Sequence, residues 1–403
     1  MSTETEERPR VYLDSVHLKG FKSIEDLSID FKKGLNILIG KNGSGKSNFL
    51  EFVDLSIRRP NTSRSVFPKT FDYAYLKFIS DDNHSFALFI EKTLSQVEVD
   101  DYGLDHRFTL LEKFEIDKTT VIDNFSIGQT KDSFYFKNKE ILYRTSIRSL
   151  FRTMGYEQFY PKFIKFNLPK THWDCISIPG TLTVELRNEF TIWGYPDCLG
   201  FLTNIFEEIE LSYDDSVKKT QANLEHSIYK QLKIDDKILE NLKRYTTIED
   251  LRFNKNINIY STEKNITIEN LKLEFKINDT WHPWSQLSDG TKRIFFVIAE
   301  AVNAKGLILI EEPELGIHPH QFNLLMDFLK EQSEDKQIII STHSPKALDH
   351  LSPDELDHIL IAYYDLEKAT QIRHLSDKEV KKARKYMKEV GFFSDYWILS
   401  DLE

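Results

Sequence analysis

Residues 35–47 read L-N-I-L-I-G-K-N-G-S-G-K-S, an apolar run followed by a glycine-rich loop. The first five residues are mostly apolar, which is typical of a strand buried on both faces of a parallel sheet. A glycine-rich loop follows, and the spacing of apolar residues over 47–56 predicts a helix. Strand, glycine loop and helix in this order predict an α/β protein with an anion site at the loop.

The loop fits a phosphate-binding motif along its whole length, G-K-N-G-S-G-K-S at 40–47. Backbone N–H groups of such a loop converge on phosphates, the lysine reaches the β and γ phosphates, and the serine hydroxyl ligates Mg²⁺. We therefore predict ATP and Mg²⁺ as ligands, with Lys46 in a catalytic role and Ser47 as a metal ligand. The residues expected to bind the nucleotide are Gly40, Lys41, Asn42, Gly43, Ser44, Gly45, Lys46, Ser47 and Asn48.

Polar side chains end two further apolar runs, G-L-I-L-I-E-E-P-E at 306–314 and Q-I-I-I-S-T-H-S-P at 337–345. Parallel sheets place ligand-facing residues at this end of their strands. We expect Glu311 to hold Mg²⁺ and Glu312 to orient and polarise an attacking water as general base. His343 is expected to sense the γ phosphate. The alternatives are a solvated strand end for the glutamates and a satisfied polar residue for the histidine.

The segment L-S-D-G-T-K-R at 287–293 opens a predicted helix whose apolar residues recur on one face. A helix N-terminus is a second potential anion site, and it has no evident phosphate within its own chain. The alternative is a simple capped helix start, with Ser288 or Asp289 as the N-cap.

Taken together, these motifs resemble the ATPase heads of the ABC superfamily, in its SMC and RecF-like branch. G-F-K-S-I at 20–24 looks like the lead-in of such heads, and 311–319 with S-T-H-S-P is similar to OLD-type AAA-family ATPases. The resemblance implies ATP held between two protomers, with Ser288 and Gly290 contacting the partner's γ phosphate and Lys22 lying near the nucleotide. A homodimer or higher oligomer is therefore expected.

Three positions depart from the pattern of that branch. Glu311 stands where ABC heads usually carry aspartate, and His318 stands where an aspartate usually links the two ATP sites. The glutamine that usually follows the first helix is not evident, and Gln96 and Gln158 are the candidates.

The resemblance covers a discontinuous head at 1–95 and 280–366, with a mixed sheet, flanking helices and an antiparallel β subdomain. We expect an inserted lobe at 96–279, mainly helical over 201–245 with β-hairpins near its end, and a basic helix and tail at 367–403. Ser376 and Glu379 form a capping-box pattern for that helix. Its basic run is interpreted as a solvated face or as a docking site for DNA or an acidic partner. The tryptophans of the lobe and its border are expected to be core or interface residues: Trp173, Trp193, Trp281 and Trp284.

Bulk composition limits the class of protein. A polar start and the lack of a long apolar run favour a cytoplasmic protein with no membrane partner. The formal net charge of -11 means that any DNA contact must come from a local basic patch or from a partner. Cys175 and Cys198 lack the spacing of a disulfide framework or a zinc site, so buried thiols are expected.

OLD proteins usually continue into a Toprim nuclease, for which the segment after Leu366 is too short. The chain thus resembles the ATPase subunits of two-gene phage-defence systems such as PARIS and Septu. The leading hypothesis is an ATP-hydrolysing switch that controls a separate nuclease or toxin in anti-phage defence. The alternatives are a RecF-like DNA-repair clamp, a scaffold that binds ATP and scarcely hydrolyses it, and, last, a transporter ATPase.

Overall fold

A computed structural model gives the fold of two compact units of the chain, which comprise Met1–Phe163, Ala304–Glu312 and Leu329–Glu403 in the first and Ile164–Asn303 and Pro313–Phe328 in the second. The structure describes residues 8–58, 70–94, 108–126, 133–136, 139–142, 147–157, 159, 162–164, 181–185, 191–192, 234–254, 258–261, 265–269, 272–400 and 402.

A mixed sheet of twelve strands organises the first unit, in the order β10-β18-β19-β3-β20-β21-β2-β1-β4-β5-β6-β7. Its parallel part consists of β18 (Leu307–Glu311), β19 (Gln337–Thr342), β3 (Leu35–Ile39) and β20 (Ile359–Asp365). Its other strands are β1 (Val11–Phe21), β2 (Ile24–Asp30), β4 (Tyr73–Ser80), β5 (Ser85–Leu94), β6 (Phe108–Ile116), β7 (Thr119–Ser126), β10 (Lys162–Ile164) and β21 (Ala369–His374). This arrangement confirms the predicted α/β class with a large mixed sheet.

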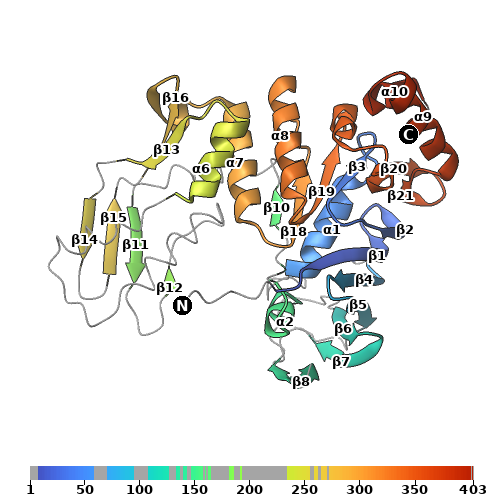
Figure 1. The fold of residues 1–403 in the computed structure, drawn as a ribbon. Coiled ribbons are helices and arrows are strands. Elements are labelled where there is room, and N and C mark those ends of the chain that lie inside the picture. Colours follow the sequence, from blue (N-terminus) through green and yellow to red (C-terminus); the bar gives the residue numbers. More distant parts are fainter. Residues whose placement is uncertain are drawn as a thin grey trace, which may run out of the picture. The chain divides into compact units, whose positions relative to one another are not determined.

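The parallel strands are buried as their apolar sequences predict. Every residue of β18, β3 and β19 is buried, including the polar ones at their ends. Figure 1 shows β19 beside β3, and the pairing is parallel from Ile338↔Leu35 to Thr342↔Ile39. The carboxyl ends of three strands therefore meet at one edge of the sheet, and the motif residues leave the sheet there.

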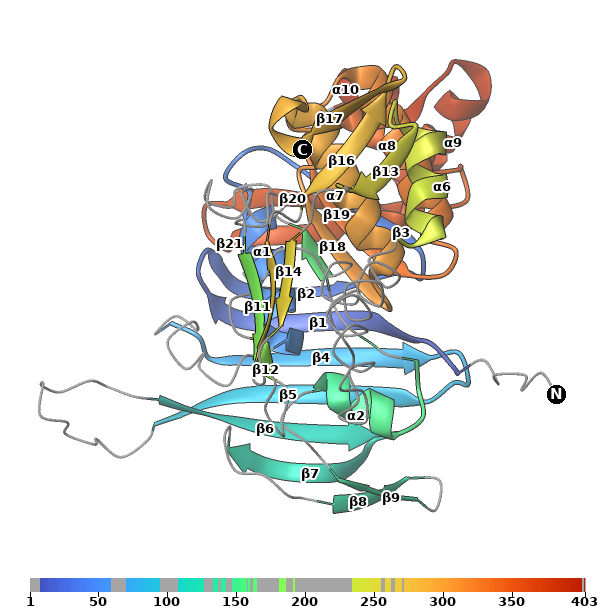
Figure 2. The ribbon, with the colours of Figure 1, turned by 90° about the vertical axis from the view of Figure 1, so that its left-hand side faces the viewer.

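Antiparallel strands continue the sheet on the other side of β21. Strands β1, β4, β5, β6 and β7 follow one another in Figure 2, each antiparallel to its neighbour. Strands β4 and β5 form a hairpin, and side chains of β4 alternate between buried and partly exposed. Strands β6 and β7 belong to this sheet, so the head extends beyond the boundary expected at residue 95. They join the sheet because β6 pairs with β5, and β7 pairs with β6, in antiparallel ladders.

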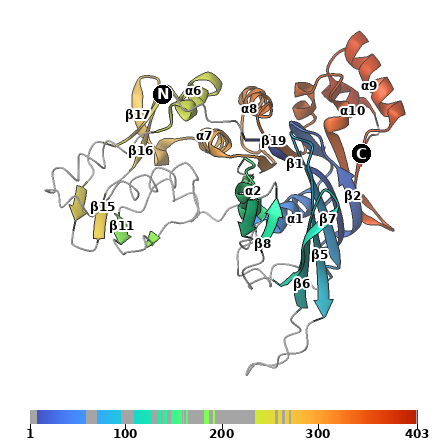
Figure 3. The same cartoon turned by 60° about the horizontal axis from the view of Figure 1, so that its bottom comes forward.

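Two helices cover one face of the sheet, α1 (Lys46–Arg58) and α2 (Ile147–Thr153). Figure 3 shows both on the same side of the antiparallel strands. Their apolar residues enter one core with those of the strands, for example Phe49 and Val53 from α1 and Phe151 from α2. Helix α8 (Pro319–Gln332) joins the ends of β18 and β19 in the sequence, as a parallel sheet requires. The short strands β8 (Ser133–Phe136) and β9 (Lys139–Leu142) form a separate ribbon.

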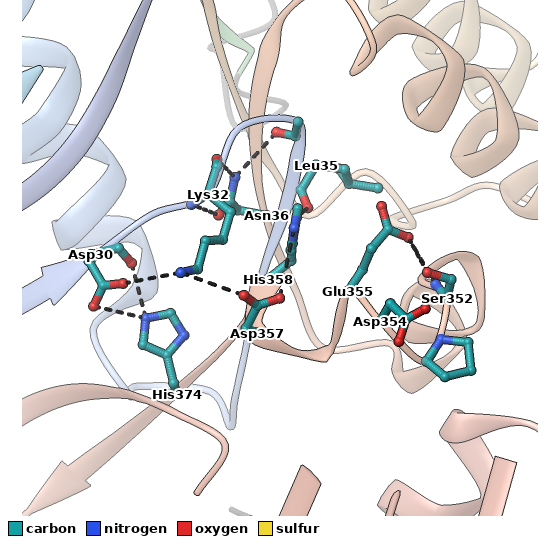
Figure 4. Close-up of polar contacts among 12 residues, drawn as sticks. Asp30, Lys32, Leu35, Asn36, Ser352, Asp354, Glu355, Asp357, His358 and His374 are labelled. Atoms are coloured by element: carbon teal, nitrogen blue, oxygen red, sulfur yellow. Dashed lines mark hydrogen bonds and ion pairs between the residues drawn. The ribbon is translucent and has the colours of Figure 1, made fainter. Parts of the chain in front are cut away.

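Charged and polar groups tie together the turns at the opposite end of the parallel strands (Figure 4). Lys32 Nζ lies 3.5 Å from an oxygen of Asp357 and 3.9 Å from one of Asp30, and His374 Nε2 lies 3.3 Å from Asp30. Nearby, His358 Nδ1 is hydrogen-bonded to the Leu35 carbonyl over 2.9 Å. These contacts fix the turns that precede β3 and β20.

Within the described residues, the second unit contains two small sheets, two whole helices and most of α8. Its four-stranded sheet has the order β12 (Thr191–Ile192), β11 (Thr181–Glu185), β15 (Asn265–Glu269) and β14 (Asn258–Ser261). Its three-stranded sheet is β13 (Asp250–Phe253), β16 (Leu273–Ile277) and β17 (Thr280–Pro283), beside α6 (Asp236–Tyr245) and α7 (Asp289–Asn303). Trp284 is buried against Phe275 and Phe295, as expected of a core aromatic.

In the described part of the lobe at 96–279, α6 lies within 201–245, where helices are predicted, and the paired strands β14 and β15 lie near its end, where hairpins are predicted. The other described elements of this range are mostly strands. Much of that helical pattern lies over 201–233, outside the described residues, as do Gln96, Gln158, Trp173, Trp193, Cys175 and Cys198.

The chain ends in the helices α9 (Asp377–Glu389) and α10 (Phe393–Leu399). The predicted capping box is present, because the Ser376 side chain accepts from the Glu379 N–H and the Glu379 carboxylate accepts from the Ser376 N–H. The basic side chains of α9 are exposed, and Arg384 Nε donates to the Pro353 carbonyl. No helix within the described residues is long and apolar enough to cross a membrane.

Candidate functional site

The phosphate loop connects β3 to α1 at the carboxyl edge of the parallel strands. Gly43 and Gly45 adopt positive φ values of 81° and 93°, which residues with side chains rarely adopt. A Cβ on Gly45 would stand 2.2 Å from Thr370 Oγ1, and a Cβ on Gly40 would stand 2.1 Å from the Ala362 carbonyl oxygen. Glycine is therefore required at positions 40 and 45, because atoms of the neighbouring strands β20 and β21 contact the loop there.

Lys46 begins α1, and its side chain folds back over the loop. Its ammonium donates to the carbonyl oxygens of Gly40 at 2.6 Å and Lys41 at 3.0 Å, and the residue is 5 % exposed. The exposed residues of the loop are Lys41, Asn42, Gly43 and Ser47. The ammonium therefore lies at the loop, with its charge balanced by carbonyl dipoles that phosphate oxygens could replace.

His343 connects the end of β18 to the phosphate loop. Its Nε2 lies 2.7 Å from Glu312 Oε1, and its Nδ1 lies 2.8 Å from the Gly40 carbonyl oxygen. The same Nδ1 lies 3.3 Å from the Lys46 ammonium, so the histidine contacts the loop carbonyl, the loop lysine and the glutamate. The structure thus brings together three residues that the sequence predicts as catalytic: Lys46, Glu312 and His343.

Backbone conformation aims Glu312 at the histidine. Its φ is +47°, the left-handed region that costs a residue with a side chain about 1–3 kcal/mol. The Glu312 N–H donates to the Ser341 carbonyl over 2.8 Å, and this bond between the two strand ends holds the conformation. An observed strained residue at a strand end is a common mark of a functional site.

Glu311 and Ser341 face each other across β18 and β19. Glu311 is 8 % exposed, and its carboxylate has no hydrogen-bond or ion-pair partner among the described residues. The Ser341 hydroxyl is fully buried and also has no partner in the part of the chain described. By strand alternation, both side chains share the sheet face of Leu309 and Ile339, which pack in the core with α1.

Such unpaired oxygens fit Mg²⁺ with its water shell, since this ion prefers oxygen ligands and keeps several waters. Ser47, at the start of α1, supplies a further exposed hydroxyl. The described residues hold no group of three or more His, Cys, Asp or Glu side chains that could bind a metal. Glu311 and Ser47 would therefore hold the ion together with phosphates and water. Sequence reasoning missed Ser341, because only the strand register reveals it.

Lys22 and Asn48 make contacts with the protein itself. Lys22 Nζ donates to Glu51 of α1 over 2.6 Å, and Asn48 Nδ2 donates to Ser23 Oγ over 2.7 Å. Thr370 Oγ1 donates to the same Ser23 hydroxyl over 2.8 Å. These bonds attach the turn between β1 and β2 to the start of α1. Ser23 lies in the G-F-K-S-I segment, whereas no sequence signal marks Thr370.

The segment 287–293 lies in the second unit. Ser288 Oγ accepts from the Thr291 N–H over 3.2 Å and caps α7, as the simpler interpretation predicts. A Cβ on Gly290 would stand 2.9 Å from the Gly316 carbonyl oxygen, so glycine lets the 313–318 loop approach α7. Exposed His318 accepts from the His320 N–H at the start of α8. A role of Ser288 and Gly290 in nucleotide binding stays a prediction.

Two family models match the chain. One, described as "AAA ATPase domain", matches residues 12–180. The other, described as "AAA domain, putative AbiEii toxin, Type IV TA system", matches residues 187–349. The two models together include the phosphate loop, both strand-end glutamates and His343.

Similar proteins include an ATP/GTP phosphatase of Helicobacter pylori and a DNA replication and repair protein RecF of Halothermothrix orenii. The phosphatase is 24% identical over 353 residues, which is 84% of this chain and 87% of the relative. RecF is 32% identical over 113 residues, 26% of this chain, and the chain matches only 30% of its length. A solved SMC head bound to the C-winged helix domain of ScpA aligns over 92% of this chain and 99% of that one, with 15% identity and a TM-score of 0.48.

Proposed function

Since the chain is an ABC/SMC-like AAA-type ATPase in its family matches and its motifs, we propose that it binds ATP with Mg²⁺, hydrolyses it, and acts as a cytoplasmic switch. One observation carries the hydrolytic part of the proposal. His343 makes hydrogen bonds to both Glu312 and the Gly40 carbonyl, so the general-base candidate is coupled to the phosphate loop. A protein that only bound nucleotide would not need this connection.

Each residue of the site has a role that follows from its position. Phosphates bound at 40–47 would accept hydrogen bonds from backbone N–H groups of the loop. They would also attract the Lys46 ammonium away from the Gly40 and Lys41 carbonyls. Glu312 would accept a hydrogen bond from a water beside the γ phosphate, and His343 would hold the Glu312 carboxylate in place. When bound, Mg²⁺ supplies charge neutralisation at the β and γ phosphates.

ATP-dependent assembly and a separate effector form the second part of the proposal. Ser288 and Gly290 of one protomer would meet the γ phosphate of another, which joins two copies around ATP. The description of the model matched by 187–349 names a toxin and a toxin–antitoxin system, which supports a role in anti-phage defence. The partner would be a nuclease or toxin subunit, as in the systems of OLD-like ATPases that the sequence resembles.

Steady-state phosphate release tests the enzymatic part. Glu312→Gln should lower kcat about 10²–10⁴-fold while ATP still binds, because only the general base is lost. Lys46→Ala should lose ATP affinity as well. The matched control is Glu334→Gln, an exposed glutamate away from the site, which should turn over ATP like the wild type. Equal turnover by wild type and Glu312→Gln would refute hydrolysis at this site.

Co-purification tests the switch. The tagged Glu312→Gln chain, expressed from its native operon with ATP and Mg²⁺, should carry a nuclease or toxin that mass spectrometry identifies. Lys46→Ala should lose it. Purification of the homodimer alone, under conditions in which ATP is retained, would contradict control of a separate effector.

A RecF-like DNA clamp is the second candidate, supported by the 32% identity to RecF over 113 residues. It predicts ATP-dependent DNA binding without any partner protein, with affinity that falls steeply as salt rises. An electrophoretic mobility assay with and without ATP distinguishes it from the switch.

A further inference from the structure

The hairpin formed by β20 and β21 lies directly against the phosphate loop. Strand β20 runs parallel to β3 up to the pair Ile361↔Ile39, so Ala362 comes beside Gly40, whose Cβ position its carbonyl oxygen blocks. Thr370 of β21 blocks the Cβ position of Gly45 in the same way. Both ends of the loop are thus bordered by this one hairpin.

Tyr364 projects from the hairpin on the side of α1. It pairs with Thr370 in an unbroken antiparallel register, so the two side chains share one face of the sheet. That face is the one on which Leu360 and Ala362 join the core with Phe49 of α1. Cβ atoms of such a pair lie about 4.5–5.5 Å apart, so the tyrosine ring starts one side chain away from Gly45.

The ring of Tyr364 is exposed, as a surface that binds a ligand must be. Tyr364 is 57 % exposed, and within the described residues it has no hydrogen-bond or aromatic partner. The preceding residues of β20, from Ile359 to Ala362, are buried. The tyrosine is thus where the strand emerges from the core, beside the N-terminus of α1, and its ring is open to a ligand.

We propose that Tyr364 is the stacking surface for the base of the nucleotide, a purine in the case of ATP. The proposal rests on the proposed function, because phosphates bound at 40–47 direct the ribose and base outward from the carboxyl edge of the sheet. An aromatic face binds any base by stacking, and the larger purines make the larger contact. The loop then recognises the phosphates and Tyr364 recognises the base.

Calorimetric titration of the full chain tests this with two probes, the β,γ-imido analogue of ATP and inorganic tripolyphosphate, both with Mg²⁺. Tyr364→Ala should weaken binding of the analogue about tenfold and leave tripolyphosphate within about twofold. Tyr364→Phe keeps the ring and should bind both probes like the wild type. Tyr135→Ala, which removes another exposed tyrosine (72 % exposed), is the control for surface change.

The outcomes separate the two proposals. An unchanged analogue affinity in Tyr364→Ala, or an equal loss for both probes, overturns the stacking role while nucleotide binding stands. Wild type that binds tripolyphosphate as tightly as the analogue also overturns it. Wild type that binds neither probe refutes the nucleotide site and the stacking role together.

Discussion

Replacing Gln337 with leucine should destabilise the first unit by about 1–5 kcal/mol. Gln337 begins β19 and is fully buried, and its Oε1 accepts from the Leu13 N–H over 2.8 Å. Its Nε2 donates to the carbonyls of Leu13 and Lys32, at 2.8 and 3.0 Å. Strand β2 pairs with β1 only from Ser15 onward, so the glutamine amide takes the place of a strand partner for Leu13.

The magnitude follows from counting the groups that leucine would leave unpaired. The Lys32 carbonyl keeps a hydrogen bond from Asn36 Nδ2 at 2.8 Å, so only the N–H and C=O of Leu13 lose their partner. Each unpaired buried group costs about 1–3 kcal/mol, and the near-equal volume of leucine avoids a cavity. The sum is about 2–6 kcal/mol, from which the apolar burial gained subtracts roughly 1 kcal/mol.

Guanidinium unfolding measures the change, and hydrogen exchange of the peptide containing Leu13 locates it. The matched control is Gln371→Leu, whose amide also donates to backbone carbonyls, Asp26 and Lys368, but at the surface. We expect a change below about 1 kcal/mol there. A loss below about 1 kcal/mol for Gln337→Leu, with unprotected exchange only at the termini, would refute the reasoning.

Three further predictions concern the site and its support. Gly45→Ala should abolish binding of ATP in calorimetry, because φ is +93° and the new Cβ would stand 2.2 Å from Thr370 Oγ1; retained binding would contradict the packing argument. His343→Gln should lower kcat about 10²-fold with less than threefold change in ATP affinity, because Glu312 loses its positioning contact; a larger affinity loss would indicate phosphate binding instead. Burial alone would raise the pKa of Glu355, but hydrogen bonds from Lys330 and the Ser352 N–H and hydroxyl lower it to about 2. Because the pKa of Glu355 is lower in the folded state, its ionised carboxylate stabilises the fold at pH values above the unfolded pKa of about 4.5. This contribution to the free energy of unfolding is lost as the pH falls toward 2. Partial exposure limits the effect to about 1 kcal/mol, so the stability difference between wild type and Glu355→Gln should shrink between pH 5 and 2.5 by about that amount in urea unfolding.

The parallel core was predictable because its signals are local. L-N-I-L-I, L-I-L-I-E and Q-I-I-I-S-T are apolar runs that end in chemically distinctive residues, and a strand buried on both faces needs no distant information to be recognised. From the order of these runs follows the placement of Lys46, Glu312 and His343 at one edge. The sequence does not predict which atoms touch, and the bond from His343 to the Gly40 carbonyl appears only in three dimensions.

Other parts depend on partners distant in sequence. Gln337 looks like an ordinary polar residue at the start of a strand, yet its role is set by a gap in the pairing of β1 at Leu13, which lies 324 residues away in the sequence. The head boundary expected at residue 95 fails for the same reason, because β6 joins the sheet through its ladder with β5. Ser341 and Thr370 gain their places from strand register, which no single segment encodes.

The fold also explains how the general-base candidate is held in place. Glu312 follows a strand buried at every position, its N–H is held by the Ser341 carbonyl, and its carboxylate meets His343. Strain of about 1–3 kcal/mol at its positive φ is therefore opposed by contacts from the neighbouring strand. A carboxylate fixed in this way has little freedom to lose when a water and a phosphate arrive. His343 also contacts the phosphate loop, so a change in the loop would reach Glu312 through one side chain. In the proposed switch, this one hydrogen-bonded residue would link a bound γ phosphate to the general base.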